Sequence, residues 1–269
     1  MPKMRPMASI PASTAKRYWW PDPPLVAARR AGRAAFHMTQ LFFSEYNAEE
    51  SPLAAPRPLV IVGAGGLGRE VLLLLQQLNE AGANWDVRGF YDDQPPAGPT
   101  VTGLPYLGTT HDLNQTTEPL AVAVAVGSSV SRAAVVGRLT SAQLSFPALV
   151  HPGVRLAAHQ RIALGKGCLI QQGCILTCDI VLGCFVLVNL SCTIGHDAVL
   201  EDFCSLMPHA NVGGAAHLGA GTYLGTNATI IQAVRVGAGT IIGAGAVVVR
   251  ELPAGVTAVG VPAKAINNE

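Results

Sequence analysis

The chain has 269 residues, of which 49% are hydrophobic and 13% are charged. This composition excludes a generally disordered chain and suits one large or two ordinary domains with buried cores. The 18 Lys and Arg residues nearly balance the 17 Asp and Glu residues. Charge therefore gives no reason to expect binding to nucleic acid or to an anionic membrane. No apolar run reaches the roughly 18 residues of a membrane span, and no secretory signal is recognisable.

Residues 1–57 differ from the rest of the chain. The first forty residues carry seven basic side chains and one acidic one, and six prolines fall among the first 24. Because proline interrupts regular elements, we predict a disordered extension. The alternative is a basic interaction arm or an organelle transit peptide, with Tyr18, Trp19 and Trp20 as an anchor.

Residues 58–146 predict a Rossmann-like α/β domain. Short apolar runs indicate buried strands, and between them apolar residues recur at helical spacing. Strands that alternate with helices imply a parallel sheet. In chain order, we expect a strand over 59–62, a glycine turn over 63–68, a helix over 69–79, a strand over 87–91, a strand over 121–126 and a helix over 130–139.

The glycine turn is a candidate anion site. A strand, a glycine turn and a helix N-terminus together present backbone N–H groups to a phosphate. Asp92 and Asp93 follow the next strand, where a carboxylate can bind a ribose hydroxyl or a nucleobase edge. Taken alone, this pattern suits NAD as well as a nucleotide sugar. The candidate substrate-binding residues are Gly63, Gly65, Gly66, Leu67, Asp92 and Asp93.

Residues 147–266 follow a six-residue repeat. From Leu164 to Val248, every sixth residue is Leu, Ile or Val, fifteen times in succession. Glycine follows eight of these aliphatic residues, and a small or modest residue usually stands four positions after them. We expect the aliphatic residue to fill the interior of a prism, the small residue to fit its corner and the glycine to ease the turn. The pattern predicts a left-handed parallel β-helix.

The repeat also accounts for most of the cysteines. Cys168, Cys174, Cys192 and Cys204 share the small inward position and are assigned to packing. Cys178 and Cys184 lie outside that phase, so we expect them to be more exposed. None of the six cysteines forms a CxxC pair or a zinc-ligand spacing. Thiols without evident pairing favour a reducing compartment, and we expect a cytoplasmic protein without a metal.

Five segments in this order resemble one known family. They are Leu59 to Glu70, Gly89 to Asp93, His151-Pro152, Ile194 to Asp197, and Gly260 to Lys264. Together they resemble the sugar O- and N-acyltransferases of the NeuD and PglD type, over about residues 58–266. The resemblance implies an N-terminal domain that holds a sugar or nucleotide-sugar acceptor. It also implies a homotrimer that binds acetyl-CoA in a groove between neighbouring subunits.

The resemblance assigns roles to particular residues. His196 matches the general base, and its neighbour Asp197 is suited to orienting the imidazole. As the third residue of its repeat unit, His196 is expected to point outward. The residues matched to the acetyl-CoA site are Asn189 near the reaction centre, Ser205 at the acetyl group, Gly214 at the thioester carbonyl, Thr226 and Ala244 along the pantetheine arm, and Lys264 near the phosphates.

Two positions depart from the family pattern. Ser205 stands where the family often has a second histidine that contacts the acetyl group. Leu67 stands where the family usually has the histidine of a Gly-His-Gly loop, and leucine has no group that donates to a phosphate or a sugar. The second departure affects the acceptor, because Leu67 lies in the glycine turn. The acceptor contacts that the resemblance implies are therefore affected most.

Two other functions can be built on the same β-helix. A zinc carbonic anhydrase on the same β-helix needs three converging histidines, but His196, His209 and His217 are spaced 13 and 8 apart, which does not fit. A non-catalytic protein that binds a nucleotide sugar or NAD, with the β-helix used only for trimer assembly, fits the repeat equally well.

Overall fold

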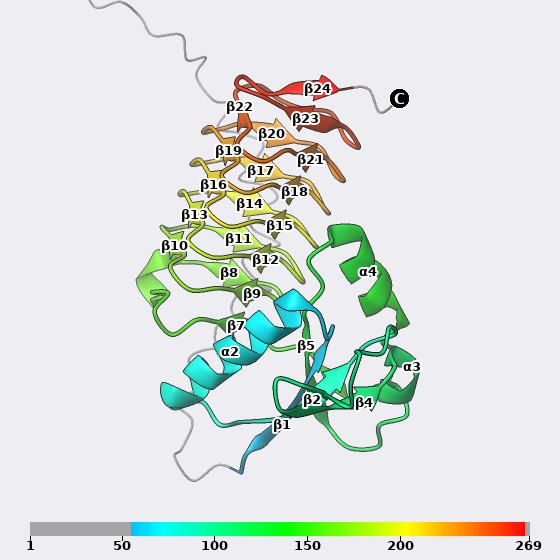
Figure 1. Ribbon diagram of the computed structural model, residues 1–269. Helices are drawn as coiled ribbons and strands as arrows, with labels where there is room; N and C mark the ends of the chain where they lie inside the picture. Colours follow the sequence, from blue (N-terminus) through cyan, green and yellow to red (C-terminus); the bar gives the residue numbers. More distant parts are fainter. Residues whose placement is uncertain (1–54, 267–269) are drawn as a thin grey trace, which may run out of the picture.

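The computed structural model describes residues 55–266, which form an α/β sheet unit followed by a long stack of coils (Figure 1). Most of the predicted extension over residues 1–57 lies outside the described residues. Within the described residues, no helix is both long enough and apolar enough to cross a membrane.

The N-terminal part is a six-stranded sheet with strand order β3-β4-β2-β1-β5-β6. Its pairs are parallel except for the β3–β4 hairpin. The predicted apolar strands form the centre of this sheet, and α2 is the helix predicted over residues 69–79. The elements are β1 (Arg57–Val62), α2 (Gly66–Glu80), β2 (Trp85–Tyr91), β3 (Thr100–Val101), β4 (Leu104–Gly108), α3 (Thr110–Leu113), β5 (Leu120–Val124), α4 (Ser129–Arg138) and β6 (Leu144–Ser145).

The elements β3, β4, α3 and β6 were not predicted from the sequence. The hairpin between β3 and β4 turns at Thr102 and Gly103, both with positive φ, which is the geometry of a tight hairpin turn. Its strands are only two and five residues long, so periodicity did not reveal it. The predicted boundary between residues 146 and 147 falls between β6 and the first strand of the coils, β7 (Leu149–Val150).

The C-terminal part is a left-handed parallel β-helix whose inner coils contain 18 residues, since Thr193 pairs with Asn211 and Asn211 with Thr229. The first coil is longer and the last is shorter, since Leu149 pairs with Leu169 and Ile241 with Thr257. Each coil visits three sheets in turn, here called the first, second and third faces. The first face holds β7, β9 (Leu169–Ile170), β12 (Leu187–Val188), β15 (Ser205–Leu206), β18 (Tyr223–Leu224), β21 (Ile241–Ile242), β23 (Thr257–Val259) and β24 (Lys264–Ile266). The second face holds β10 (Ile175–Leu176), β13 (Thr193–Ile194), β16 (Asn211–Val212), β19 (Thr229–Ile230) and β22 (Val247–Val248). The third face holds β8 (Ala163–Leu164), β11 (Val181–Leu182), β14 (Val199–Leu200), β17 (His217–Leu218) and β20 (Arg235–Val236).

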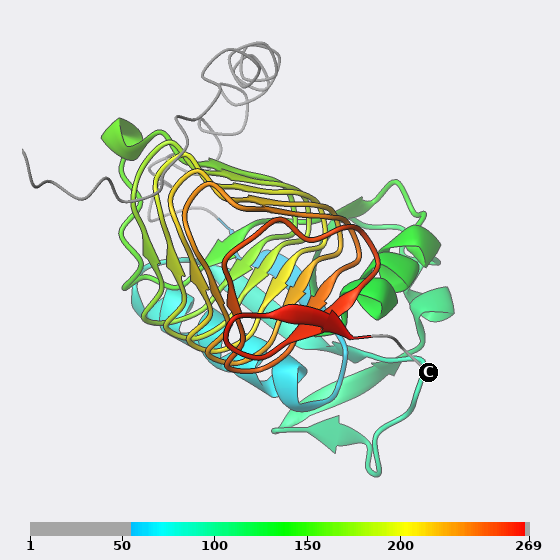
Figure 2. The ribbon, with the colours of Figure 1, turned by 90° about the horizontal axis from the view of Figure 1, so that it is seen from above.

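The interior of the prism matches the predicted phase. The second residue of each short strand is aliphatic and fills the core, as with Ile194 at 1% and Leu200 at 0% exposure. The small residues sit buried at the corners. They include the four cysteines assigned to packing, which are all buried, whereas Cys178 and Cys184 are half-buried. Figure 2 looks down the stack and shows the coils in register.

The predicted role of glycine was wrong in one respect. The left-handed turn residue of a corner is its third residue, for example Asp197 with φ 58°, and not the glycine that follows the aliphatic residue. That glycine is required because successive coils approach closely at this point. A Cβ on Gly195 would lie 2.6 Å from the nitrogen of Gly214 on the next coil. Glycine at this position therefore permits stacking, while αL conformations turn the corner.

The first face of the β-helix packs against the N-terminal part. Leu149, Leu169 and Leu187 of this face are 1–2% exposed and share one core with α2. At the corner between the third and first faces, Phe185 lies between Phe146 and Phe203, with ring centroids 5.2 and 5.4 Å away. Burial of these leucine and phenylalanine side chains stabilises the contact between the two parts.

Candidate functional site

His196 lies at a corner between the second and third faces, where residues 195–198 connect β13 to β14. Its side chain is 65% exposed, which agrees with the predicted outward orientation. The Nδ1 atom is 2.8 Å from Oδ2 of Asp197. Because a carboxylate only accepts hydrogen bonds, Nδ1 carries the proton, and in the neutral imidazole Nε2 keeps a free lone pair. This is the tautomer that a general base needs.

The backbone of this corner is fixed by its neighbours in the stack. The Asp197 N–H donates to the carbonyl of Cys178 on the coil below, and the His196 carbonyl accepts from Ala215 on the coil above. The imidazole lies against Gly214, since a Cβ built there would be 2.6 Å from Nε2. Gly214 therefore leaves the space that the ring occupies, and Nε2 of His196 adjoins the Gly214 backbone.

A second feature is a set of unpaired backbone N–H groups. Gly214, Thr226 and Ala244 each occupy the second position of a corner that borders the second face. Within residues 55–266, their N–H groups have no acceptor. At two corners between the third and first faces, side chains accept from the corresponding groups: Asp202 from Cys184, and Glu201 from Ala220. At other corners of that edge, such as those of Asp202 and Ala238, the corresponding N–H groups have no acceptor among the described residues either. The three residues matched to acetyl-CoA thus have open donors, but open donors of this kind are not confined to the second face.

Three other predicted residues are placed differently. Asn189 is 8% exposed, and its Oδ1 accepts from the N–H of Leu190, so its side chain already caps a corner. Lys264 lies on β24, in the antiparallel hairpin with β23, and is exposed. Ser205 is fully buried, and its hydroxyl donates to the Gly127 carbonyl. The expected contact of Ser205 with the acetyl group is therefore not supported, because a buried hydroxyl with internal partners is not accessible to acetyl-CoA.

The glycine turn lies at the carboxyl ends of β1 and β5, where the strand order of the sheet changes direction. Ligands of open α/β sheets bind at such a switch point. Gly63 has φ 110°, and a Cβ there would lie 2.5 Å from the Ala125 carbonyl oxygen. Gly65 and Gly66, which begin α2, are exposed, whereas Leu67 is half-buried against the apolar core. Leu67 thus contributes packing at the position where the family has a histidine.

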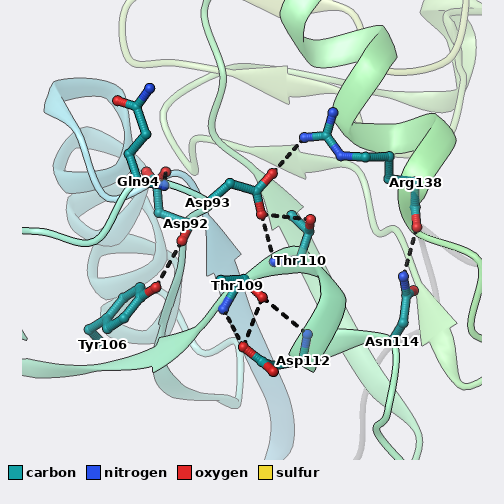
Figure 3. A network of polar contacts seen from close by, with 9 residues as sticks. All are labelled: Asp92, Asp93, Gln94, Tyr106, Thr109, Thr110, Asp112, Asn114 and Arg138. Carbon is teal, nitrogen blue, oxygen red and sulfur yellow. Dashed lines mark hydrogen bonds and ion pairs between the residues drawn. The ribbon is translucent and has the colours of Figure 1, made fainter.

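Asp92 holds the glycine turn in place. One carboxylate oxygen accepts from the N–H of Ala64 at 2.7 Å, and the other accepts from Gln94 at 2.9 Å. Its backbone carbonyl accepts from the Tyr106 hydroxyl (Figure 3). The carboxylate therefore accepts from one N–H of the glycine turn, and that N–H is not available to a phosphate. Its predicted contact with a ribose or a base remains a prediction.

Asp93 is also engaged within the chain. Its Oδ1 accepts from the N–H and the hydroxyl of Thr110, and its Oδ2 pairs with Arg138 at 2.7 Å (Figure 3). Desolvation raises the pKa of this carboxyl, but the hydrogen bonds from Thr110 and the charge of Arg138 outweigh it, so the net pKa is lowered. This carboxylate thus connects β2, α3 and α4 at the same edge of the sheet.

We expect Asp93→Asn to destabilise the protein by about 1 kcal/mol at neutral pH, since the group is partly exposed. A lowered pKa means that the carboxylate stabilises the fold above its ordinary value of 3.8 and loses this contribution as pH falls through the folded value. The difference in melting temperature between wild type and variant should shrink from pH 7 to about pH 3. An equal difference at both pH values would show that ionisation of Asp93 is not responsible.

The three histidines considered for zinc do not converge. His196 lies at a corner between the second and third faces, His209 at a corner between the first and second, and His217 on the third face. Both nitrogens of His217 are taken, one by Glu201 at 2.7 Å and the other by Arg235 at 2.9 Å. Among the residues described, no group of three His, Cys, Asp or Glu side chains is arranged to hold a metal ion.

The solved structures that this chain is similar to are acetyltransferases, and they define the class to which its fold belongs. The PglD N-terminal domain family matches residues 58–139. The acetyltransferase domain of PglB from Neisseria gonorrhoeae, solved with acetyl coenzyme A, is 31% identical, with a TM-score of 0.71, over 79% of this chain and 100% of that one. A comparison with curated proteins found no match.

Two further solved structures are similar to nearly the same extent. PerB from Caulobacter crescentus, in complex with CoA and GDP-perosamine, is 30% identical over 80% of this chain and 98% of that one, with a TM-score of 0.71. WeeI from Acinetobacter baumannii is 30% identical over 78% of this chain and 100% of that one, also with a TM-score of 0.71. The chain belongs to the PglD-type family of sugar acetyltransferases.

Proposed function

We propose that this protein transfers the acetyl group of acetyl-CoA to an amino or hydroxyl group of a nucleotide-linked sugar, with His196 as the general base. The observation that carries the proposal is the pair formed by His196 and Asp197. The pair presents a free Nε2 lone pair on an exposed corner, beside the backbone of Gly214. The solved relatives with CoA and GDP-perosamine support the same pair of substrates.

The chemistry follows from this arrangement. Nε2 of His196 accepts the proton of the acceptor amine or hydroxyl as its nitrogen or oxygen attacks the thioester carbonyl carbon. The carbonyl oxygen gains negative charge, and the unpaired N–H of Gly214 is suited to donate to it. The carbon–sulfur bond then breaks, and the imidazolium returns the proton to the departing thiolate of CoA. Asp197 stabilises the imidazolium between these two steps.

We further propose that CoA lies along the second face. Two corners farther up the stack, on the opposite edge of the second face from His196, offer the unpaired N–H groups of Thr226 and Ala244, and both residues are exposed. Backbone donors suit the amide-rich pantetheine arm, because they need no particular side chain. Lys264 is exposed at the far end of the stack, where its charge suits the phosphates of CoA.

The acceptor site and the base then belong to different copies of the chain. The N-terminal part, with its switch point, packs on the first face. His196 lies at the corner between the second and third faces, which is the corner opposite the first face of a three-sided prism. A sugar held at the switch point is thus separated from His196 of the same chain by the β-helix. A homotrimer, in which each acceptor site faces the base of a neighbour, resolves this separation.

The test is turnover of acetyl-CoA with a panel of acceptors. The panel contains GDP-perosamine, UDP-linked amino sugars and sialic acid, and free CoA thiol is measured over time. We expect acceptor-dependent release of CoA by at least one member, and an unchanged rate after dialysis against a chelator. Absence of turnover with every member, or a rate that disappears on chelation and returns with a metal, would contradict the proposal.

A further inference from the structure

Arg132 on α4 is a buried cation between the two parts of the chain. It is 1% exposed, and burial lowers the pKa of its guanidinium to about 10, so it stays charged at neutral pH. Within the described residues, no carboxylate forms an ion pair with it. A buried charge without a counter-ion is costly unless hydrogen bonds satisfy it fully.

The guanidinium is satisfied entirely by oxygen atoms of three segments. Nη1 donates to the carbonyls of Val126 and Gly127, which follow β5. The Nε atom donates to Phe185 at 2.9 Å, and Nη2 donates to Phe203 at 2.8 Å. Phe185 and Phe203 are the αL residues of two successive corners. One side chain therefore joins the loop after β5 to two coils of the β-helix.

Ser205 completes this buried network. Its hydroxyl accepts from Nη2 of Arg132 at 2.8 Å and donates to the Gly127 carbonyl at 3.0 Å. It also lies 3.0 Å from the hydroxyl of Ser129, the first residue of α4. Ser205 lies nine residues after His196 in the chain, at the end of the coil that carries His196. The loop at the switch point is thus fixed directly to the coil that carries the proposed base.

We propose that Arg132, with Ser205 as its partner, is a positioning residue for acetyl transfer that sets the acceptor-binding edge of the sheet relative to the β-helix. This inference rests on the proposed function. If each acceptor reaches the base of a neighbouring chain, then the angle between the two parts of one chain decides where the sugar arrives. A misplacement of about 1 Å can lower a rate by 10²-fold, and six hydrogen-bonded oxygens hold this angle.

The variants are Arg132→Lys, which keeps the charge but loses the planar set of donors, and Ser205→Ala, which keeps the arginine. Arg88→Met is the control, because it removes an exposed ion pair with Asp86 elsewhere in the same sheet. We expect Arg132→Lys to raise the KM of the acceptor by about 10-fold or more and to leave the KM of acetyl-CoA within about 2-fold. Ser205→Ala should shift the same parameter by a smaller factor, and Arg88→Met should shift neither.

Amide hydrogen exchange of residues 125–129 provides a second readout that does not depend on turnover. We expect faster exchange there in Arg132→Lys than in wild type, with the strands β1 and β5 unchanged. Equal changes in both KM values, or unchanged acceptor KM with unchanged exchange, would overturn the inference. An increase in the KM of acetyl-CoA alone for Ser205→Ala would contradict the inference and support a contact between Ser205 and the acetyl group. If wild type turns over no acceptor, the proposed function fails, and the exchange measurement alone decides whether Arg132 fixes the loop.

Discussion

Replacement of His196 by asparagine is expected to lower kcat by about 10²- to 10⁴-fold, the range that a positioned general base contributes. The amide of asparagine keeps polarity at the corner but does not accept the acceptor's proton at neutral pH. Because the side chain is exposed and does not support the core, the variant should fold and assemble as wild type does. Acetyl-CoA binding, measured by calorimetry, should change little.

The matched control for this variant is His159→Asn. His159 is an exposed histidine of the short 3-10 helix Ala158–Gln160, on the same edge of the stack but two coils below His196, since Asp179 donates to Gln160 and Asp197 donates to Cys178. Its replacement should leave kcat unchanged. Turnover by His196→Asn within about 2-fold of wild type would refute the assignment of the base, since the loss of a general base has a much larger effect.

Replacement of Gly214 by alanine is expected to lower kcat by about 10- to 100-fold without a loss of stability, because a small displacement of a catalytic group has effects of this size. The added methyl would lie 2.6 Å from Nε2 of His196, and the exposed ring is free to swing away from it. The backbone of Gly214 does not have positive φ, so alanine is tolerated there. The base would therefore leave its position while the coil remains stacked.

Gly213→Ala provides the contrasting case at the neighbouring residue. A Cβ at this position would lie 2.5 Å from the backbone nitrogen of Gln232 on the next coil, which has no freedom to move. We expect this variant to lower the melting temperature by several degrees, as overpacking typically costs about 1–3 kcal/mol. If Gly214→Ala also unfolds early while its remaining folded fraction retains full activity, the proposed contact with His196 is wrong.

The β-helix was predictable in detail because its sequence rule is local and repeated. One inward aliphatic residue in six, with a small residue four positions later, fixes the phase of each side chain. The outward orientation of His196 and the burial of Cys192 follow from that phase alone. The parallel sheet was predictable for the same reason, since β1 and β5 are continuous apolar runs that no exposed strand would tolerate.

The polar contacts between distant segments were not predictable. Arg132 looks like a surface residue of a short helix, and its six acceptors come from residues 5 to 73 positions away. Ser205 was matched to the acetyl group because the family has a histidine there, but contacts with α4 bury it. Asp92 and Asp93 were expected to face a ligand, yet both carboxylates accept hydrogen bonds from the chain itself. No sequence pattern reports such partners.

The most direct test of the central claim is the mass of the acceptor after incubation with acetyl-CoA. Wild-type protein and His196→Asn would be incubated side by side with each amino-sugar nucleotide of the panel, and the products separated and weighed by mass spectrometry. We predict that one acceptor gains a single acetyl group with wild type and remains unmodified with His196→Asn over the same time. Acetylated product in equal amount from both proteins, or from neither with any acceptor, would contradict the account.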